Sequence, residues 1–348
     1  MMKVPERIED ITAAWMTGAL QEKYPGVTIN KADIVDVVHG ACTKIRIGLE
    51  GDRPDLPPRM LMKIGFEQHS PKMRGMHLNE YNAYTRLLPT VDISHPACHA
   101  AVLDDEGKSL VVLEDLCLRD VTFVTLQKPI GFDLAAAFLE GLARLHARWW
   151  DAPELRTDFA WVPGTSEAEM EHYFTLLLTP ELFEGFATAP RGAAMPKMVL
   201  DPPRVRAGLA AMRKAHEGMA KVVNHGDMHL GNLYTNADGS PGFLDSQPRL
   251  GAWSIDVSYF ITAGLDLVDR RRWQGALLQR YIAALAAQGV TPPSFDEAFA
   301  AFRRDVIWGH LIWMLNGSHF QTEANNTAAA TRFAMAMVDL DTFGALGV

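Results

Sequence analysis

Short apolar runs with interleaved polar positions dominate the first third of the chain and predict β-strands. Three such runs lie between residues 34 and 64, and a hairpin with an Asp-Asp-Glu-Gly-Lys turn follows. Two other segments carry apolar residues at helical spacing, and a proline follows each of them. The expected strands are 34–38, 43–49, 59–64, 100–103 and 109–113, and the expected helices are 8–24 and 78–88.

Helical periodicity dominates the rest of the chain. Five apolar residues from Leu134 to Trp149 recur with a period near 3.6 and predict a core helix over 134–150, with Asp133 as its N-cap. A chain of 348 residues exceeds one typical core, so we expect an α+β protein of two lobes. Further helices are expected to begin within 251–260 and to cover 273–288, 295–315 and 331–343.

Two apolar runs in the second half each end in polar side chains. The run at Val222 leads into Asp227 and Asn232, and the run at Gly242 leads into Asp245. An Asp-Gly pair and a proline separate the runs, so we expect them to pair as a hairpin that brings the three polar side chains together. Carboxylate and amide oxygens suit Mg²⁺, and phosphoryl transfer needs such a cation beside an oxygen that orients the acceptor hydroxyl.

These motifs resemble the catalytic loop and metal-binding aspartate of the aminoglycoside phosphotransferase and choline/ecdysteroid kinase-like superfamily. The resemblance rests on His225-Gly226-Asp227 with Asn232, and on Leu244-Asp245 with Gln247. It implies a bilobal protein-kinase-like fold, with a nucleotide-binding lobe over residues 1–116 and a mostly helical catalytic lobe over 117–348. It also implies a kinase that uses ATP and Mg²⁺ to phosphorylate a hydroxyl of a small molecule. In that reading Asp227 is the catalytic base, Asn232 and Asp245 are the metal ligands, and His225 braces the loop. The chain departs from the usual pattern at Leu230 and Ser246.

The same resemblance assigns nucleotide-binding roles in the first lobe. Lys63 would contact phosphates and pair with Glu80 from the following helix, although a strand lysine that faces solvent and a surface acid are the plainer alternatives. The turn at Gly40 and Thr43 would face phosphate, or be an ordinary hairpin. Backbone groups near Glu114 and Leu116 would contact adenine at the junction of the lobes, or simply end a strand.

Three further features have weaker functional implications. His146 is best interpreted as a core histidine with satisfied hydrogen bonds, and we assign it no chemistry. Asp256 lies in the first turn of a helix, where it suits the helix dipole, and it also resembles the aspartate that holds the catalytic-loop backbone in this superfamily. Residues 151–200 contain eight acids against three bases, which indicates either a solvated helix face or an acidic wall for a cationic acceptor.

Composition and charge indicate the class of protein, its location and its partners. The chain is 48% hydrophobic and 22% charged, as in folded proteins, and its net charge of −9 argues against a nucleic-acid partner. The three cysteines, at positions 42, 98 and 117, have no spacing of a disulfide framework or zinc site, so we expect a cytoplasmic protein. No apolar stretch approaches the ~20 residues of a membrane span. The expected partners are a nucleotide and a small-molecule acceptor; the alternative is a catalytically idle nucleotide-binding module that serves an interaction.

Overall fold

The computed structural model describes residues 2–164, 178–193 and 195–348, which fall into two compact units. The first unit contains residues 1–122 together with 236–239 and 243–247, and the second contains the remainder. This division differs from the single boundary expected at residue 116. The two later segments join the first unit because Arg119 Nη2 donates to Asn236 Oδ1 at 2.8 Å and Phe243 N donates to the Ser94 carbonyl at 2.9 Å.

A five-stranded antiparallel sheet forms the first unit, in the order β1-β2-β3-β5-β4. Its strands contain the five predicted runs, and β1 begins earlier than expected because residues 29–33 continue the pairing with β2. The elements of this unit are α1 (Ala13–Leu20), β1 (Ile29–Val38), β2 (Thr43–Gly51), β3 (Arg59–Ile64), α2 (Arg74–Asn82), β4 (Cys98–Leu103) and β5 (Ser109–Glu114).

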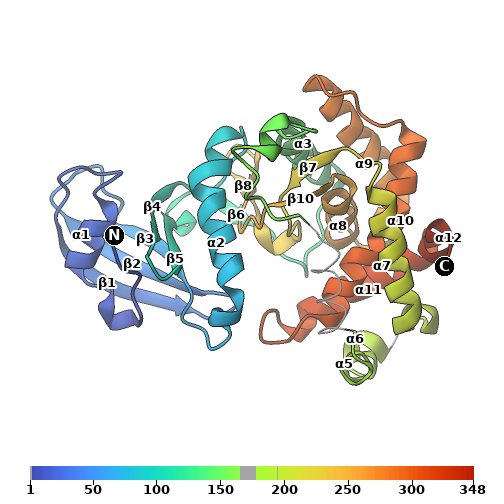
Figure 1. The fold of residues 1–348 in the computed structure, drawn as a ribbon, viewed down its shortest axis with the longest axis horizontal. Helices are drawn as coiled ribbons and strands as arrows, with labels where there is room; N and C mark the ends of the chain where they lie inside the picture. Colours follow the sequence, from blue (N-terminus) through green and yellow to red (C-terminus); the bar gives the residue numbers. More distant parts are fainter. Residues whose placement is uncertain (1, 165–177, 194) are drawn as a thin grey trace. The chain divides into compact units, whose positions relative to one another are not determined.

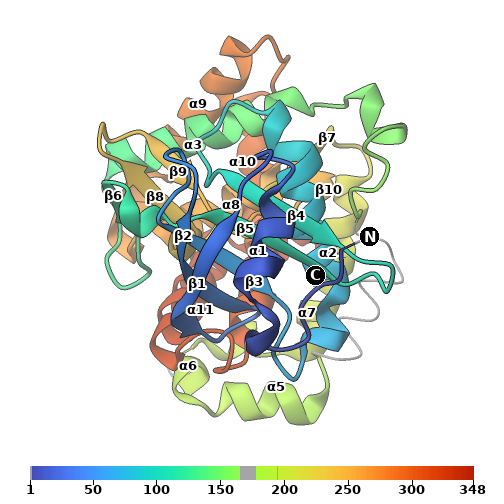
Figure 2. The same cartoon turned by 90° about the vertical axis from the view of Figure 1, so that its left-hand side faces the viewer.

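The two helices of this unit cover opposite faces of the sheet, as Figure 1 shows. In Figure 2, α1 lies in front of the strands. Met60 and Met62 of β3 pack in one hydrophobic core with Met16 and Leu20 of α1. Because side chains alternate along a strand, Lys63 points to the other face, on the side of α2. The alternation of side chains along β3 therefore places Lys63 against α2 and not against α1.

The second unit is mainly helical. In its core α3 packs against α9, and α10 packs against α8 and α11. These interfaces are filled by large apolar side chains, among them Phe138, Phe260, Phe302 and Phe333, each no more than 1% exposed. Its helices are α3 (Phe132–Arg148), α5 (Pro180–Ala187), α6 (Pro190–Ala193), α7 (Pro202–His216), α8 (Ser254–Gly264), α9 (Leu267–Ala287), α10 (Phe295–Leu315), α11 (Glu323–Asp339) and α12 (Thr342–Leu346).

The pairing predicted around the central motifs is wrong in one respect. The run at Val222 lies in β7 (Lys221–Asn224), which pairs with β10 (Arg249–Ala252) and not with the run at Gly242. The predicted turn instead joins β8 (Leu233–Asn236) to β9 (Pro241–Phe243), which form a small sheet with β6 (Val121–Phe123). The apolar pattern of β8, Leu-Tyr-Thr-Asn, is too short to predict a strand from the sequence.

Three predicted helix ends also need correction. The first helix does not span 8–24, because Thr12 caps α1 by accepting a hydrogen bond from Trp15 N, and only a short 3₁₀ turn precedes it. Asp133 is not the N-cap of α3; Gly131 holds that position and Asp133 lies in the first turn. The helix predicted over 331–343 is two helices, separated at Asp341, whose φ of 47° is left-handed.

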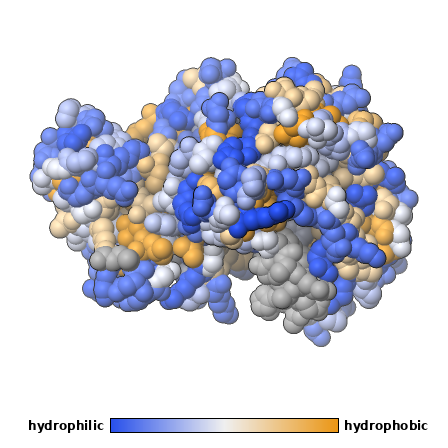
Figure 3. All heavy atoms as spheres, turned by 45° about the horizontal axis from the view of Figure 1, so that its top comes forward, coloured by the Kyte–Doolittle hydropathy of each residue, from blue (hydrophilic) through white to orange (hydrophobic). Residues whose placement is uncertain are grey.

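The α+β fold class predicted from the sequence is confirmed. Cys42, Cys98 and Cys117 are free thiols. In the described residues, no helix has the length and apolar character required to cross a bilayer. Polar and charged residues cover much of the face seen in Figure 3, with hydrophobic residues in scattered patches. Of the eight acids counted in residues 151–200, Glu167, Glu169 and Glu171 lie outside the described residues.

A buried histidine in α10 is expected to make the protein less stable at acidic pH. Burial lowers the pKa of His310 to about 4, although its Nε2 bonds the Val199 carbonyl at 2.9 Å. The unfolded chain, with a histidine pKa of about 6.5, therefore binds a proton that the folded chain does not between these values. We expect the free energy of unfolding to fall as pH drops from about 6.5 to about 4, and urea titrations should show a smaller fall in His310→Gln. Equal slopes in the two proteins would contradict this reading.

Candidate active site

The loop after β7 is held by a buried aspartate in the second unit. Asp256, in the first turn of α8, accepts hydrogen bonds from the backbone N–H groups of His225 at 2.5 Å and Gly226 at 3.2 Å. Gly226 has a φ of 87°, which is strained for any residue that carries a side chain, so the turn requires glycine. His225 is buried, and its Nδ1 lies 3.4 Å from the Asp227 N–H. Both residues therefore contact the backbone of the loop, which is compatible with the bracing role that the resemblance implies.

His146 extends this support. Its imidazole is completely buried, with Nδ1 2.7 Å from the Tyr281 hydroxyl and Nε2 3.5 Å from Asp256 Oδ2. The interpretation of His146 as a satisfied core histidine is thus correct, and its position behind Asp256 explains why a polar residue is kept in the core of α3.

The braced loop presents Asp227 as a charged group. Asn232 Nδ2 donates to Asp227 Oδ2 at 2.8 Å and to the Asp227 carbonyl at 3.0 Å. Burial by itself would raise the pKa of Asp227, but the neighbouring His229 and the Asn232 hydrogen bond hold it below its usual value. The side chain remains 39% exposed, so an ionised carboxylate on a fixed loop is available to an incoming ligand.

His229 is a member of this cluster that the sequence reasoning missed. Its Nδ1 accepts a hydrogen bond from Gly231 N at 3.0 Å, so in the neutral ring the proton sits on Nε2. That Nε2 lies 3.5 Å from Asp227 Oδ2, and the ring packs edge-on against Trp313. The spacing of His229 two residues after Asp227 was the available signal, but the same pattern also fits a plain core histidine.

Removing the Asp256 charge should loosen the loop. Asp256→Asn replaces one acceptor by a donor that faces a backbone N–H, and hydrogen bonds to charged groups contribute about 1.5–3 kcal/mol each. We expect the free energy of unfolding to fall by about 2–3 kcal/mol in urea titrations. Asp266→Asn is the matched control, because Asp266 accepts two backbone N–H bonds at the start of α9, where asparagine caps equally well. Equal losses in the two variants would contradict the bracing role.

A second charged cluster lies in the first unit. Lys63 Nζ pairs with Glu80 of α2 and with Asp245 Oδ1, the latter at 2.8 Å, and Lys44 Nζ lies 3.1 Å from Asp245 Oδ2. Lys63 and Glu80 are about 5% exposed, so the pair is buried. The predicted Lys63–Glu80 pair is therefore present, and the alternative of a lysine facing solvent is wrong. Lys44 was missed, because a lysine on the polar side of a strand gives no distinguishing signal.

The charges in this cluster compensate one another. Burial alone would lower the pKa of Lys63, but the carboxylates of Asp245 and Glu80 raise it well above its ordinary value. Burial would likewise raise the pKa of Asp245, yet Lys44 and Lys63 hold it far below its usual range. Asp245 also has a left-handed φ of 50°, a conformation that aspartate tolerates better than most residues. The cluster is thus a fixed set of two cations and two carboxyl groups.

The remaining residues expected to contact nucleotide agree only in part with that expectation. Gly40 lies in the turn between β1 and β2, as expected. The Thr43 side chain is fully buried and donates to Glu67 Oε1 at 2.7 Å, which leaves no exposed hydroxyl for phosphate. Glu114 ends β5 and its carboxylate binds the Ala97 N–H and Arg119, while Leu116 starts a 3₁₀ turn. Contact between adenine and the backbone groups of Glu114 and Leu116 remains a prediction.

In the described residues no group of three or more His, Cys, Asp or Glu side chains forms a closed metal site. The oxygen donors expected for Mg²⁺ belong to two segments, Asn232 in the second unit and Asp245 in the first. Asn232 uses its amide nitrogen for Asp227, so its Oδ1 is left as the possible ligand atom. The role of Asn232 and Asp245 as Mg²⁺ ligands stays a prediction.

The fold is shared with small-molecule phosphotransferases of known structure. The choline kinase LicA of Streptococcus pneumoniae superposes with a TM-score of 0.55 at 12% identity, over 94% of this chain and 98% of LicA. The choline kinase of Cryptosporidium parvum gives 0.55 at 12%, over 95% and 96%. The GDP and kanamycin complex of APH(2")-IIia gives 0.51 at 12%, over 95% and 98%. No family model and no curated protein matches the sequence.

Proposed function

We propose that the protein is a kinase that uses ATP and Mg²⁺ to phosphorylate a hydroxyl group of a small molecule. The observation that carries this proposal is Asp227, an ionised and partly exposed carboxylate on a loop that Asp256 holds by two backbone hydrogen bonds. A fixed carboxylate of this kind orients an acceptor hydroxyl and takes its proton. A module that only bound nucleotide would have no use for it.

The charged cluster of the first unit supplies the nucleotide side of the proposal. Lys63, positioned by Glu80, would hold the phosphates, and Lys44 is a second cation at the same carboxylate. Asn232 and Asp245 would hold Mg²⁺, which offsets charge on the phosphates and transferring group when bound. The likeness to choline kinases and to APH(2")-IIia supports a small acceptor over a protein acceptor, but at 12% identity it does not choose among acceptors.

A screen for nucleotide turnover tests the proposal. Purified protein with MgATP should release ADP faster in the presence of at least one pool drawn from alcohols, amino alcohols, sugars and steroids. The pools can then be divided to find the acceptor. Acceptor-independent nucleotide binding without turnover in every pool would instead favour the idle nucleotide-binding module.

A further inference from the structure

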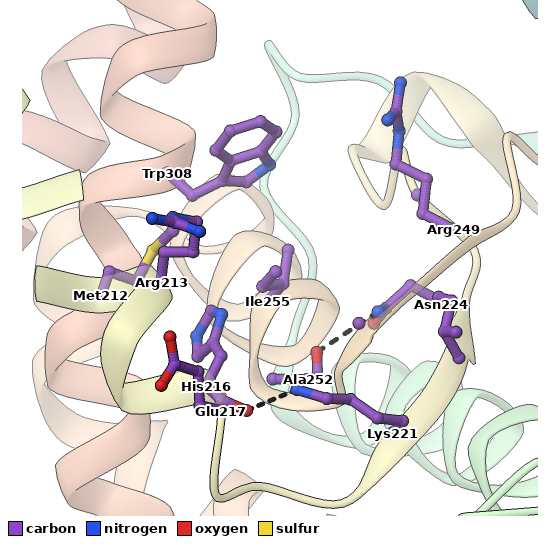
Figure 4. A pocket seen from close by; sticks show the side chains of 13 residues that line it. Met212, Arg213, His216, Glu217, Lys221, Asn224, Arg249, Ala252, Ile255 and Trp308 are labelled. Carbon is purple, nitrogen blue, oxygen red and sulfur yellow. Dashed lines mark hydrogen bonds between the residues drawn. The ribbon is translucent and has the colours of Figure 1, made fainter. Parts of the chain in front are cut away.

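A cavity of about 240 Å³ lies within the second unit, beside the braced loop. Five elements form its wall: α7, β7, β10, α8 and α10 (Figure 4). Asn224 and Gly226 line it, whereas Asp227, the residue that follows them, does not. The cavity is therefore distinct from the surface on which Asp227 is presented, although it reaches the same loop.

The apolar part of the wall fits a ring-sized molecule. Trp308, half-buried on α10, faces the cavity together with Ile255 of α8 and Met212 of α7. A cavity of about 150 Å³ already accommodates benzene, so this one has room for a bicyclic ring or a branched aliphatic chain. An indole wall also favours flat ligands, since aromatic pairs contribute about 0.5–1.5 kcal/mol beyond the area they bury.

The polar part of the wall is positively charged. Of the described residues, three bases (Arg213, Lys221 and Arg249) and one acid (Glu217) line the cavity. Lys221 Nζ donates to the His216 carbonyl. Loss of water around Lys221 lowers the pKa of its ammonium group, even though Asp151 and Glu217 oppose that change. The two acids thus compensate this charge incompletely, and an anion placed in the cavity would stabilise it.

One wall of the cavity is fixed by a buried polar network. His216 Nε2 lies 2.9 Å from both oxygens of Asp305, which is completely buried in α10. Ser254 Oγ donates to the same carboxylate at 2.5 Å. The network joins α7, α8 and α10, so the cavity keeps its shape without a ligand. A preformed site of this kind loses little entropy when it binds.

We propose that this cavity binds a small organic carboxylate, with its apolar body against Trp308 and Ile255 and its carboxylate facing Lys221 and Arg213. The site is additional to the proposed phosphoryl-transfer site. It does not depend on that function, because binding requires neither nucleotide nor turnover.

Matched probes that differ in charge test the proposal. Isothermal titration calorimetry of the full chain, without nucleotide, would compare indole-3-propionate with tryptamine, and phenylpropionate with phenethylamine. Each pair shares a ring and differs in the sign of its charge. We expect the acids to bind at least about tenfold more tightly than the amines, a difference of about 1.4 kcal/mol. Failure of both acids to bind at millimolar concentration, or equal affinity of acid and amine, would overturn the proposal.

Variants then locate the bound acid. Lys221→Met should weaken it at least about fivefold, and Trp308→Ala at least about tenfold, whereas Lys214→Met should change the affinity by less than about twofold. Lys214 is an exposed lysine of α7 outside the cavity, so it controls for the change in net charge. Acid binding that neither Lys221→Met nor Trp308→Ala weakens would place the acid elsewhere and overturn the proposal.

Discussion

Replacing Asp227 with asparagine is expected to lower kcat for phosphoryl transfer by about 10²–10⁴-fold, the range for loss of a general base. Asparagine keeps an oxygen that can accept the hydrogen bond from Asn232, so the loop should retain its conformation. Because the lysine cluster lies on other elements of the chain, ADP affinity should change by less than about twofold. The measurements are steady-state turnover with the acceptor found in the screen and calorimetric titration of ADP.

The control for this variant is Asp296→Asn, the same change at an exposed position in the first turn of α10. Its kcat should match that of the unaltered protein. Full turnover by Asp227→Asn would show that Asp227 is not the catalytic base. A joint loss of turnover and ADP binding would instead mean that the residue supports the structure of the nucleotide site.

Lys63→Met is expected to cost about 3–5 kcal/mol of stability, because it leaves the buried Glu80 carboxyl without its partner. Burial raises the pKa of Glu80 even beside the lysine, so the variant should take up a proton there. The double variant Lys63→Met/Glu80→Leu should recover most of the lost free energy of unfolding in urea titrations. It should not recover ADP binding, since the cation proposed to hold phosphate is still missing.

This pair of variants separates a structural from a functional role. Lys31→Met serves as the control, because Lys31 forms an exposed pair with Asp33 on β1, and such pairs contribute about 0–1 kcal/mol. If the double variant binds ADP as well as the unaltered protein does, Lys63 is a structural residue only. If the single variant is as stable as Lys31→Met, the buried pair contributes little.

The sequence predicted the first unit well because its signals are local. All five strands were placed, since alternation of apolar and polar residues is set by burial on one face of the sheet. The Lys63–Glu80 pair followed from strand and helix assignments together with the family resemblance. Lys44 could not be found in this way, because its contact with Asp245 joins residues 201 positions apart.

The misses in the second unit have a common cause. Pairing of β7 with β10 depends on contacts between residues 25 to 31 positions apart, and the turn chemistry of residues 234–241 pointed to a nearer partner. His229 and Asp227 show the same limit within a single loop. Their side chains meet because Gly231 donates a backbone hydrogen bond to the imidazole, a tertiary detail that residue spacing does not encode. The carboxylate-binding cavity combines residues of five elements and left no sequence motif.

Transfer of label from [γ-³²P]ATP tests the central claim most directly. With Mg²⁺ and the acceptor pools, the unaltered protein should move the label into a small organic phosphate, and Asp227→Asn should not. Label found only in inorganic phosphate, or the same organic product formed at the same rate by Asp227→Asn, would contradict the account.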